Sequence, residues 1–258
     1  HIHGGDRSKG GIDEYNRHAI TKMSNIHFAV SQQSKKRILR MGEDPKFVFL
    51  TGSPSIDEIK SKAISDKKTL MEKYGINFSG KEILLVQHPV TTETKKSKIQ
   101  IQNTLTAINK LNKITIAILP NSDPGRESIQ KELKIFSKKN KKFYLFSSLP
   151  REDYLGMIKN SGVLVGNSSS GMIEASYFST PVVNIGIRQQ DRERGKNVIN
   201  VEQVTSTLIY KAIVKALNFN NKSQIKQVYG NGNASKKIVK YLEKISLDEQ
   251  LIQKQISY

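Results

Sequence analysis

The stretch of the chain best suited to chemistry is Asn-Ser-Ser-Ser-Gly at residues 167–171, directly after the apolar residues 162–165. We expect a buried strand that turns at once into a helix over 170–178. The start of such a helix leaves backbone N–H groups free, and together with the helix dipole and the three serine hydroxyls they could bind phosphate. Glu174, one turn into the helix, could accept a hydrogen bond from a ribose hydroxyl. An ordinary capped turn rich in serine fits this segment alone equally well.

Four other predicted strands are also followed by polar or small residues. The five segments that follow strands are 87–92, 120–126, 147–150, 167–171 and 186–189. The carboxyl ends of parallel strands meet at one edge of a sheet, and ligands bind there. Five such segments predict a crevice for a polar ligand. In it His88 could donate to a phosphate, Arg188 could neutralise a diphosphate, and Leu149 could offer backbone groups to a base. His88 alone would be an ordinary turn histidine.

The first residues carry a different pattern. Asp13 and Arg17 lie four residues apart on one face of a helix predicted over 12–23. They form either a simple ion pair or a carboxylate held by an arginine at a catalytic edge. His1 and His3 are spaced like metal ligands but have no third ligand nearby, so we expect no metal site. No P-loop, glycine-rich dinucleotide motif or hydrolase elbow is found.

The elements that would position these residues alternate along the chain. Predicted strands at 26–30, 47–50, 82–86, 114–119, 143–146, 163–165, 182–185 and 197–201 are separated mostly by helical stretches. Continuous Val/Ile/Leu runs between helices are typical of parallel sheets covered on both faces. Ser55 is expected to cap a helix that carries Ile56 and Ile59, and one helical tract is expected over 235–255. The fold class is therefore α/β and doubly wound.

The composition narrows the function further. The chain has 258 residues, no cysteine and a formal net charge of +19. Without cysteine there is no disulfide framework, and no apolar run is long enough to span a bilayer. The lysines are scattered and not interleaved with aromatic residues, which favours a solvated surface over a nucleic-acid partner. We expect a cytoplasmic protein with no membrane partner.

Several motifs together resemble the hydrolysing UDP-N-acetylglucosamine 2-epimerases of sialic and legionaminic acid synthesis. They lie at 1–6, 12–22, 87–92, 120–123, 166–171, 184–189, 197–198 and 229–234. The resemblance implies a GT-B fold: two Rossmann-like domains with the UDP-sugar between them. It also implies that the first domain is only partly present. The implied domains are 1–59 (the end of the first domain), 60–234 (the UDP-binding domain) and 235–258 (a last helix that packs back on the first domain).

The resemblance also implies roles for individual residues. UDP would be held by His88, Asn121, Leu149, Ser168, Ser169, Ser170, Glu174 and Arg188, with Arg17 nearby. Asp13 matches a catalytic carboxylate of the family. A second acid/base group lies near residues 1–6, where some members carry Glu in place of His3 and where Asp6 lies close by. The catalytic groups expected here are thus Asp13, Asp6 and His88.

The implied reaction eliminates UDP to give a 2-acetamidoglycal and then adds water with inversion at C2. It needs charge stabilisation at the diphosphate and carboxylates that move protons, but neither cofactor nor metal. The same chemistry on UDP-N,N'-diacetylbacillosamine is an alternative. Others are a GT-B glycosyltransferase, a UDP-sugar-binding regulatory protein and a polyanion-binding surface. A homo-oligomer is expected.

Overall fold

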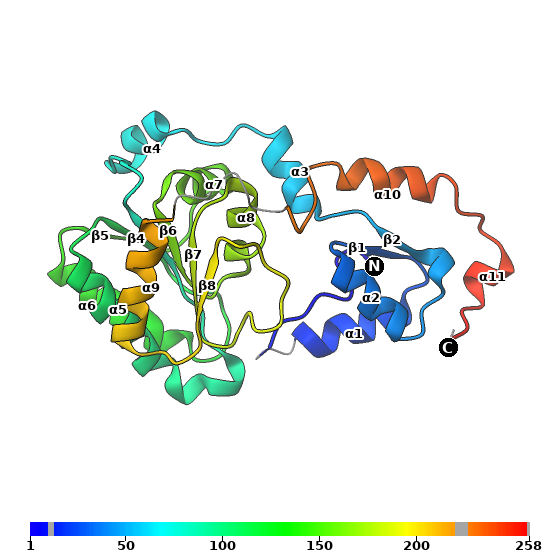
Figure 1. The fold of residues 1–258 in the computed structure, drawn as a ribbon, viewed down its shortest axis with the longest axis horizontal. Coiled ribbons are helices and arrows are strands. Elements are labelled where there is room, and N and C mark those ends of the chain that lie inside the picture. Colours follow the sequence, from blue (N-terminus) through cyan, green and yellow to red (C-terminus); the bar gives the residue numbers. More distant parts are fainter. Residues whose placement is uncertain (10–12, 220–226, 257–258) are drawn as a thin grey trace.

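The computed structural model describes residues 1–9, 13–219 and 227–256 and has a larger part and a narrower part (Figure 1). The larger part is built on a six-stranded sheet in the order β5-β4-β3-β6-β7-β8, in which all neighbours are parallel. The strands are β3 (Ile83–Val86), β4 (Thr115–Ile118), β5 (Phe143–Phe146), β6 (Val163–Gly166), β7 (Val182–Ile185) and β8 (Val198–Val201). The strand order reverses between β3 and β6, and a ligand crevice is expected at that point.

Helices cover both faces of this sheet. They are α4 (Lys67–Tyr74), α5 (Ser97–Leu111), α6 (Arg126–Lys139), α7 (Arg151–Asn160), α8 (Glu174–Phe178) and α9 (Ser206–Leu217). Alternate residues of β3 face opposite ways: Ile83 and Leu85 join the core under α5, α6 and α9, whereas Leu84 and Val86 join the core under α7 and α8. Because both faces are buried, the strands are continuous apolar runs, and each buried aliphatic side chain stabilises the fold by about 2 kcal/mol.

The narrower part contains a two-stranded parallel sheet. Its elements are α1 (Asp13–Met23), β1 (His27–Ala29), α2 (Gln32–Arg40), a 3₁₀ turn (Pro45–Phe47), β2 (Val48–Leu50) and α3 (Pro54–Ser61). Ile2 bridges Phe28 of β1 in parallel, so the first residues lie on the free side of that strand. Ser31 caps α2 by accepting a hydrogen bond from the backbone N–H of Ser34.

The two parts are joined where two distant segments touch. Ser53 donates its backbone N–H to the Tyr229 carbonyl at 2.8 Å. Gly52 and Gly230 both have φ above 90°, and a Cβ on Gly52 would lie 3.1 Å from the Tyr229 oxygen and 3.2 Å from Gly230 Cα. Glycine is therefore required here both by backbone conformation and by close approach.

The end of the chain returns to the narrower part (Figure 1). Two helices, α10 (Ala234–Leu242) and α11 (Glu249–Ile252), replace the single tract predicted over 235–255, which was wrong. Tyr241 stacks on Phe49 with ring centroids 4.1 Å apart, and Asp57 accepts hydrogen bonds from the first two N–H groups of α10. Asp248 caps α11. The bend at 243–248 lets both helices follow the surface of the narrower part.

Beyond α11, Lys254 closes a buried ionic cluster. The Glu43 carboxylate, 2% exposed, pairs with Lys22 at 2.8 Å, His27 at 2.9 Å and Lys254 at 2.6 Å. Lys254 also donates to the carbonyls of Lys22 and Ser24 at 2.7 and 2.6 Å, near the C-terminal end of α1. These carbonyls have no partner within the helix, so the lysine satisfies them and favours the helix dipole.

Two predicted helix starts need correction, and one lies outside the described residues. Ser53, not Ser55, is the N-cap of α3, because Pro54 takes the first helical position, where its missing N–H costs nothing. The α-helix predicted from residue 170 begins only at Glu174, after a 3₁₀ turn at Ser169–Gly171. The predicted start at Ile12 is not described, and α1 is seen from Asp13. The predicted domain division stays a prediction, with its 59/60 boundary inside α3.

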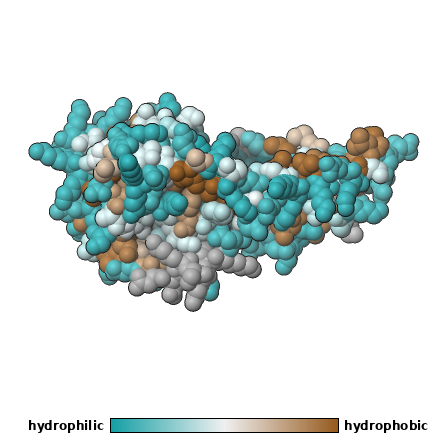
Figure 2. All heavy atoms as spheres, turned by 90° about the horizontal axis from the view of Figure 1, so that it is seen from above, coloured by the Kyte–Doolittle hydropathy of each residue, from teal (hydrophilic) through white to brown (hydrophobic). Residues whose placement is uncertain are grey.

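Hydrophilic side chains cover most of the face seen in Figure 2, and smaller hydrophobic groups lie among them. Exposed apolar residues include Val239, Leu247 and Ile252 in the C-terminal tract. In the described part of the chain, no helix is long and apolar enough to cross a membrane. Nor do residues 1–9, 13–219 and 227–256 hold a group of three or more ligands that could bind a metal.

Candidate active site

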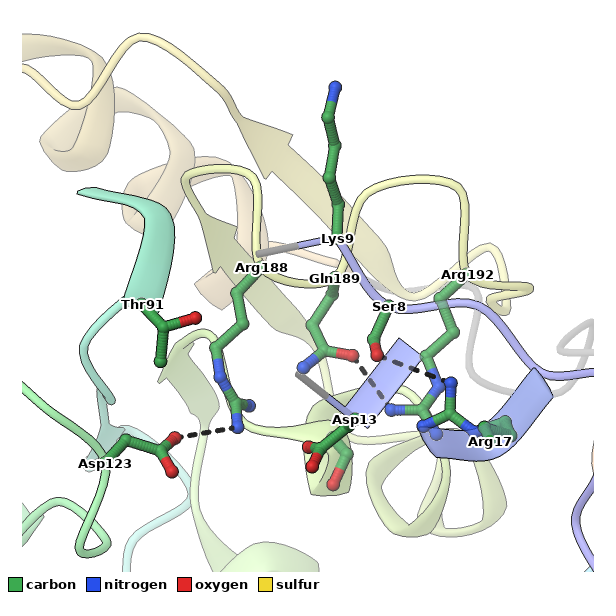
Figure 3. Close-up of a pocket in the computed structure, with 10 residues that line it drawn as sticks. Ser8, Lys9, Asp13, Arg17, Thr91, Asp123, Arg188, Gln189 and Arg192 are labelled. Atoms are coloured by element: carbon green, nitrogen blue, oxygen red, sulfur yellow. Dashed lines mark hydrogen bonds and ion pairs between the residues drawn. The ribbon is translucent and has the colours of Figure 1, made fainter. Parts of the chain in front are cut away.

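A polar cavity of about 170 Å³ lies between the first residues of the chain and the loops at the carboxyl edge of the large sheet (Figure 3). Its charged lining residues are Lys9, Arg17, Arg188 and Arg192 against Asp13 and Asp123. Ser8, Thr91, Ser169 and Gln189 complete the lining. Cations outnumber anions in the lining of this partly open cavity, so the cavity attracts an anionic ligand.

Arg188 projects into the cavity from the loop after β7. Its guanidinium donates to the Asn167 carbonyl at 3.2 Å and lies 3.6 Å from the Asp123 carboxylate (Figure 3). Burial lowers the pKa of Arg188, while the nearby Asp123 and Asp13 carboxylates oppose that effect. A guanidinium remains charged at neutral pH, and among the described residues one carboxylate, that of Asp123, pairs with it directly. Arg188 can therefore donate to a phosphate as a further partner.

His88 follows β3 and is held by two neighbouring loops. Asn167 accepts its backbone N–H at 2.7 Å and donates to its carbonyl at 2.9 Å. The Asn121 N–H lies 3.1 Å from His88 Nδ1, so we assign the imidazole proton to Nε2. Burial, reinforced by the charge of Arg188, lowers the pKa of His88 to about 4. At neutral pH His88 is an uncharged donor, suited to a hydrogen bond with an anion but not to supplying charge.

The serine turn after β6 presents one hydroxyl and buries two. Ser169 lines the cavity, whereas Ser168 and Ser170 are buried and share a 2.9 Å hydrogen bond. Tyr154 also contacts the Ser170 hydroxyl. Ser168 caps the 3₁₀ turn, and this local bonding accounts for the late start of the α-helix. The anion donors predicted here are thus those of a short turn and not of an α-helix.

This turn approaches β3 closely. Gly166 has φ +134°, and a Cβ there would lie 2.0 Å from the Val86 carbonyl oxygen. A side chain at this position would force the loop that carries Ser168 to Ser170 away from β3. Glycine therefore sets the distance between the His88 loop and the serine turn.

Three further predicted residues, two in surrounding loops and one at the start of α8, do not line the cavity, and neither does His88. Glu174 is 7% exposed and accepts a hydrogen bond from Arg151 at 2.7 Å. Asn121 is exposed, and its side chain donates to Asp123 at 2.7 Å. Leu149 packs, partly buried, against the core on the α7 side of the sheet. A ligand that filled the cavity and extended over this edge would meet them.

Helix α1 contributes Asp13 and Arg17 to the cavity, but not as the predicted pair. Arg17 donates to Glu14 at 3.1 Å, to the Asp6 carbonyl at 3.2 Å and to Ser8 Oγ at 3.4 Å (Figure 3 shows the last contact). Arg17 pairs with Glu14 and not with Asp13, because the backbone N–H of Ser8 donates to the Glu14 carboxylate at 2.8 Å and fixes its position. Asp13 is thereby left to face the cavity.

Asp6 occupies a different environment from the one expected for a proton carrier. It is 1% exposed, and its carboxylate contacts His3 Nε2 at 3.1 Å, the backbone N–H of Arg7 at 2.9 Å and the guanidinium of Arg192. Burial alone would raise the pKa of Asp6, but the His3 hydrogen bond and the Arg192 charge hold it well below its usual range. Asp6 is therefore a buried group that is ionised at neutral pH.

Sequence reasoning missed several cavity residues, above all Arg192. It is 8% exposed and bonds Asp6 and, at 2.9 Å, Gln189 Oε1. Asp123 lay within a segment singled out after a strand, but it was not assigned a role. Neither Arg192 nor Lys9 was given a role, although residues near each of them in sequence were. The high density of charged residues after β7 was the signal that could have indicated Arg192.

A second hollow of about 420 Å³ adjoins the first and shares Asp13, Arg17, Ser169 and Arg192 with it. His3 lines this hollow, as do the apolar residues Ile2, Ile20 and Ile173. The first cavity thus has a mostly charged lining, and the second hollow has a lining of charged and apolar residues. A ligand that carries both a diphosphate and a sugar would need such a pair of spaces.

Solved structures place this architecture in the GT-B class, two α/β domains with a cleft between them. One is a UDP-GlcNAc 2-epimerase from Neisseria meningitidis bound to UDP-GlcNAc, with a TM-score of 0.76 and 21% identity over 95% of this chain and 69% of that one. Another is the Methanocaldococcus jannaschii enzyme with UDP-GlcNAc and UDP, with a TM-score of 0.73 and 20% identity over 95% of this chain and 68% of that one. At these identities the likeness concerns the fold.

Residues 1–243 match the UDP-N-acetylglucosamine 2-epimerase family, and the chain belongs to it. It is 38% identical, over 100% of its length, to a UDP-N,N'-diacetylbacillosamine 2-epimerase (hydrolyzing) of Legionella pneumophila, of which it covers 67%. It is 41% identical, over 78% of its length, to the polysialic acid biosynthesis protein P7 of Escherichia coli, of which it covers 51%. It is 32% identical to a UDP-N-acetylglucosamine 2-epimerase of Neisseria meningitidis over 96% of its length and 64% of that protein. The chain thus spans about half to two thirds of these relatives.

Proposed function

We propose that the protein carrying this chain is a hydrolysing UDP-sugar 2-epimerase. It would release UDP from a UDP-2-acetamido sugar and yield the free sugar with inverted C2. The observation that carries this proposal is the cavity, in which Asp13 faces Arg188, Arg17 and Ser169 at the switch point of the sheet. Family membership is consistent with it.

The cationic side of the cavity suits the leaving group. Departure of UDP from C1 leaves negative charge on the diphosphate, and prealigned charges that meet it lower the barrier. Arg188 would supply charge, Ser169 a hydroxyl and His88 an uncharged N–H donor. Ser168, Ser170, Asn121, Leu149 and Glu174 would complete UDP binding from the surrounding loops.

Asp13 is the group we assign to proton transfer at the sugar. The C2 proton must be removed while the C1–O bond breaks, and water must then add across the double bond. Asp13 lines both hollows, so it lies between the charged space and the mixed one. Arg17 also lines both hollows, so it would lie beside Asp13 where the sugar joins the diphosphate.

Two sugars deserve testing. UDP-N-acetylglucosamine would give N-acetylmannosamine, and UDP-N,N'-diacetylbacillosamine would give the corresponding 6-deoxy-diacetamido sugar. The Legionella relative named for the second sugar has the higher identity, 38% against 32% for the Neisseria relative named for the first. A glycosyltransferase with the same crevice remains the competing function, because it would bind UDP in the same way.

The test is incubation of the full-length gene product with each UDP-sugar in D₂O, followed by proton NMR. Release of UDP with a free, C2-deuterated, C2-inverted sugar supports the epimerase and the elimination route together. UDP release only after an acceptor sugar is added would favour the glycosyltransferase. No UDP release from either sugar would refute the proposal.

We further propose that the protein works in the cytoplasm as a homo-oligomer and needs no cofactor. The absence of cysteine suits a reducing compartment. Size-exclusion chromatography with light scattering tests the oligomeric state.

A further inference from the structure

His3 lines the second hollow and has an unusual backbone conformation. Its φ is +69°, in the left-handed region that residues other than glycine seldom adopt. Its backbone N–H donates to the Phe28 carbonyl at 3.0 Å, which ties it to β1. Strain of this kind persists only where the surroundings enforce it, and it concentrates at functional sites.

A buried carboxylate orients the imidazole of His3. Asp6 accepts from His3 Nε2 at 3.1 Å, so Nε2 carries the proton and Nδ1 keeps a lone pair. The described residues lining the hollow include His3, 29% exposed at its side chain, but not Asp6, 1% exposed. Of the two, only His3 is placed to reach a ligand.

Arg192 also holds the Asp6 carboxylate. It pairs with the same carboxylate oxygen, Oδ2, that faces His3, and through Nη1 it bonds Gln189 at 2.9 Å. Gln189 in turn donates to the Asn167 carbonyl at 2.9 Å. The loop after β7 thereby reaches from the serine turn to the His3 loop in the other part of the molecule.

We propose that His3 is the second proton-transfer group of the site and that Asp6 and Arg192 are positioning residues. This inference rests on the proposed 2-epimerase function. It replaces Asp6, which was expected to carry protons, by the histidine that Asp6 orients. Asp13 and His3 line the same hollow, and inversion at C2 needs two groups that act on opposite faces of the sugar.

The proton balance can be written for these two groups. In the first step one of them takes the C2 proton, the C1–C2 double bond forms and the C1–oxygen bond to UDP breaks. Before the second step the other group takes a proton from solvent. It then gives that proton to the opposite face of C2, while water bonds to C1 and returns a proton to that donor. Each group finally releases one proton to solvent, so both return to their starting states.

The main test compares three variants of the full-length gene product in the NMR assay. His3→Gly tolerates the positive φ and leaves room for added imidazole. Asp6→Asn keeps the shape of the side chain but removes the charge that orients His3. His18→Gln is the matched control, because His18 also pairs with a carboxylate, Glu14 at 3.1 Å, but lines neither hollow.

We expect His3→Gly to lose turnover by about 100-fold or more, with UDP affinity by calorimetry within about threefold of wild type and turnover partly restored by imidazole. Asp6→Asn should lower kcat with KM little changed, and His18→Gln should keep turnover within about threefold. Near-normal turnover of His3→Gly, or a loss that imidazole leaves untouched, would overturn the inference while the wild type still releases UDP. A wild type that releases no UDP would instead refute the proposed function and this inference with it.

Discussion

The Asn167 carboxamide is hydrogen bonded through both of its polar atoms to the backbone of His88. Its Oδ1 accepts the His88 N–H at 2.7 Å, and its Nδ2 donates to the His88 carbonyl at 2.9 Å. The backbone carbonyl of Asn167 accepts hydrogen bonds from the side chains of Arg188 and Gln189. One residue of the loop after β6 therefore sets the positions of the loops after β3 and β7.

Replacing Asn167 should damage both stability and UDP binding. Asn167→Ala leaves two backbone groups of His88 without partners in a mostly buried place, so we expect a loss of about 2 kcal/mol in the free energy of unfolding. Urea denaturation measures the stability, and calorimetry measures the UDP affinity, which should fall about tenfold or more. Asn160→Ala, at the end of α7, is the control, because its amide donates to a single carbonyl within the same helix, that of Gly156. Equal losses in the two variants would contradict the role assigned to Asn167.

Arg188 should be needed for turnover more than for folding. Arg188→Ala removes the guanidinium that faces the cavity, and loss of one prealigned charge or donor costs about 100- to 1,000-fold in rate. Steady-state UDP release measures this, and Arg188→Lys should recover only part of the rate because it lacks the planar fork. Lys139→Ala, an exposed cation at the end of α6, should leave the rate unchanged. An Arg188→Ala enzyme with near-normal turnover would exclude the guanidinium from the mechanism.

Lys254 should fasten the C-terminal tract to the narrower part. Lys254→Met removes its ion pair with buried Glu43 and its bonds to carbonyls at the end of α1, which should lower the free energy of unfolding by about 2 kcal/mol. The released tract should become sensitive to protease around the bend at 243–248, which gel electrophoresis after limited digestion would detect. Lys244→Met provides a control in the bend itself. Unchanged digestion of Lys254→Met would show that Tyr241 and Asn25 suffice to hold the tract.

Stability should decrease as the pH falls below neutrality. Burial lowers the pKa of His27 to about 4 despite the opposing influence of Glu43, whereas a histidine in the unfolded chain titrates near about 6.5. Between these values the unfolded chain binds a proton that the folded one does not, so this contribution is present above about pH 6.5 and lost toward pH 4. His27 alone should reduce the free energy of unfolding by about 1–2 kcal/mol between pH 7 and pH 5.

The measurement is urea denaturation of the wild type and of His27→Gln at both pH values. His88, whose pKa is lowered in the same way, contributes to both proteins and cancels in the comparison. The variant should be less stable overall but should lose less between pH 7 and pH 5. Parallel losses in the two proteins would contradict a neutral His27 in the folded state.

The sheet and its ligand edge were predictable from sequence because they depend on local patterns. The strands Phe143–Phe146 and Val182–Ile185 were predicted to the residue, since apolar runs bounded by polar turns mark them clearly. Residues after strands are brought together by topology alone, so His88, Ser169 and Arg188 could be assigned to one crevice without knowledge of any distance. Asp13 begins a helix, and its role was implied by the family resemblance instead.

Contacts between distant segments could not be predicted. Asp6 and Arg192 are 186 residues apart, and no sequence pattern in either loop indicates that the two residues pair. The Arg17 side chain could reach Asp13 or Glu14 on α1, and the choice depends on a backbone N–H of Ser8. The bend before α11 likewise follows from anchors at Asn25 and Glu43, which lie far from it in sequence.

The return of the C-terminal tract has a consequence for how the protein is made. Glu43, Phe49 and Asp57 precede the large sheet in the chain, whereas their partners Lys254, Tyr241 and the start of α10 follow it. Domains usually fold in order as they emerge during synthesis. Until the larger sheet has been translated, Glu43 can pair with Lys22 and His27 but not with Lys254, and Tyr241 cannot yet cover Phe49. Completion of the narrower part therefore depends on translation of the larger sheet and not on its own residues alone.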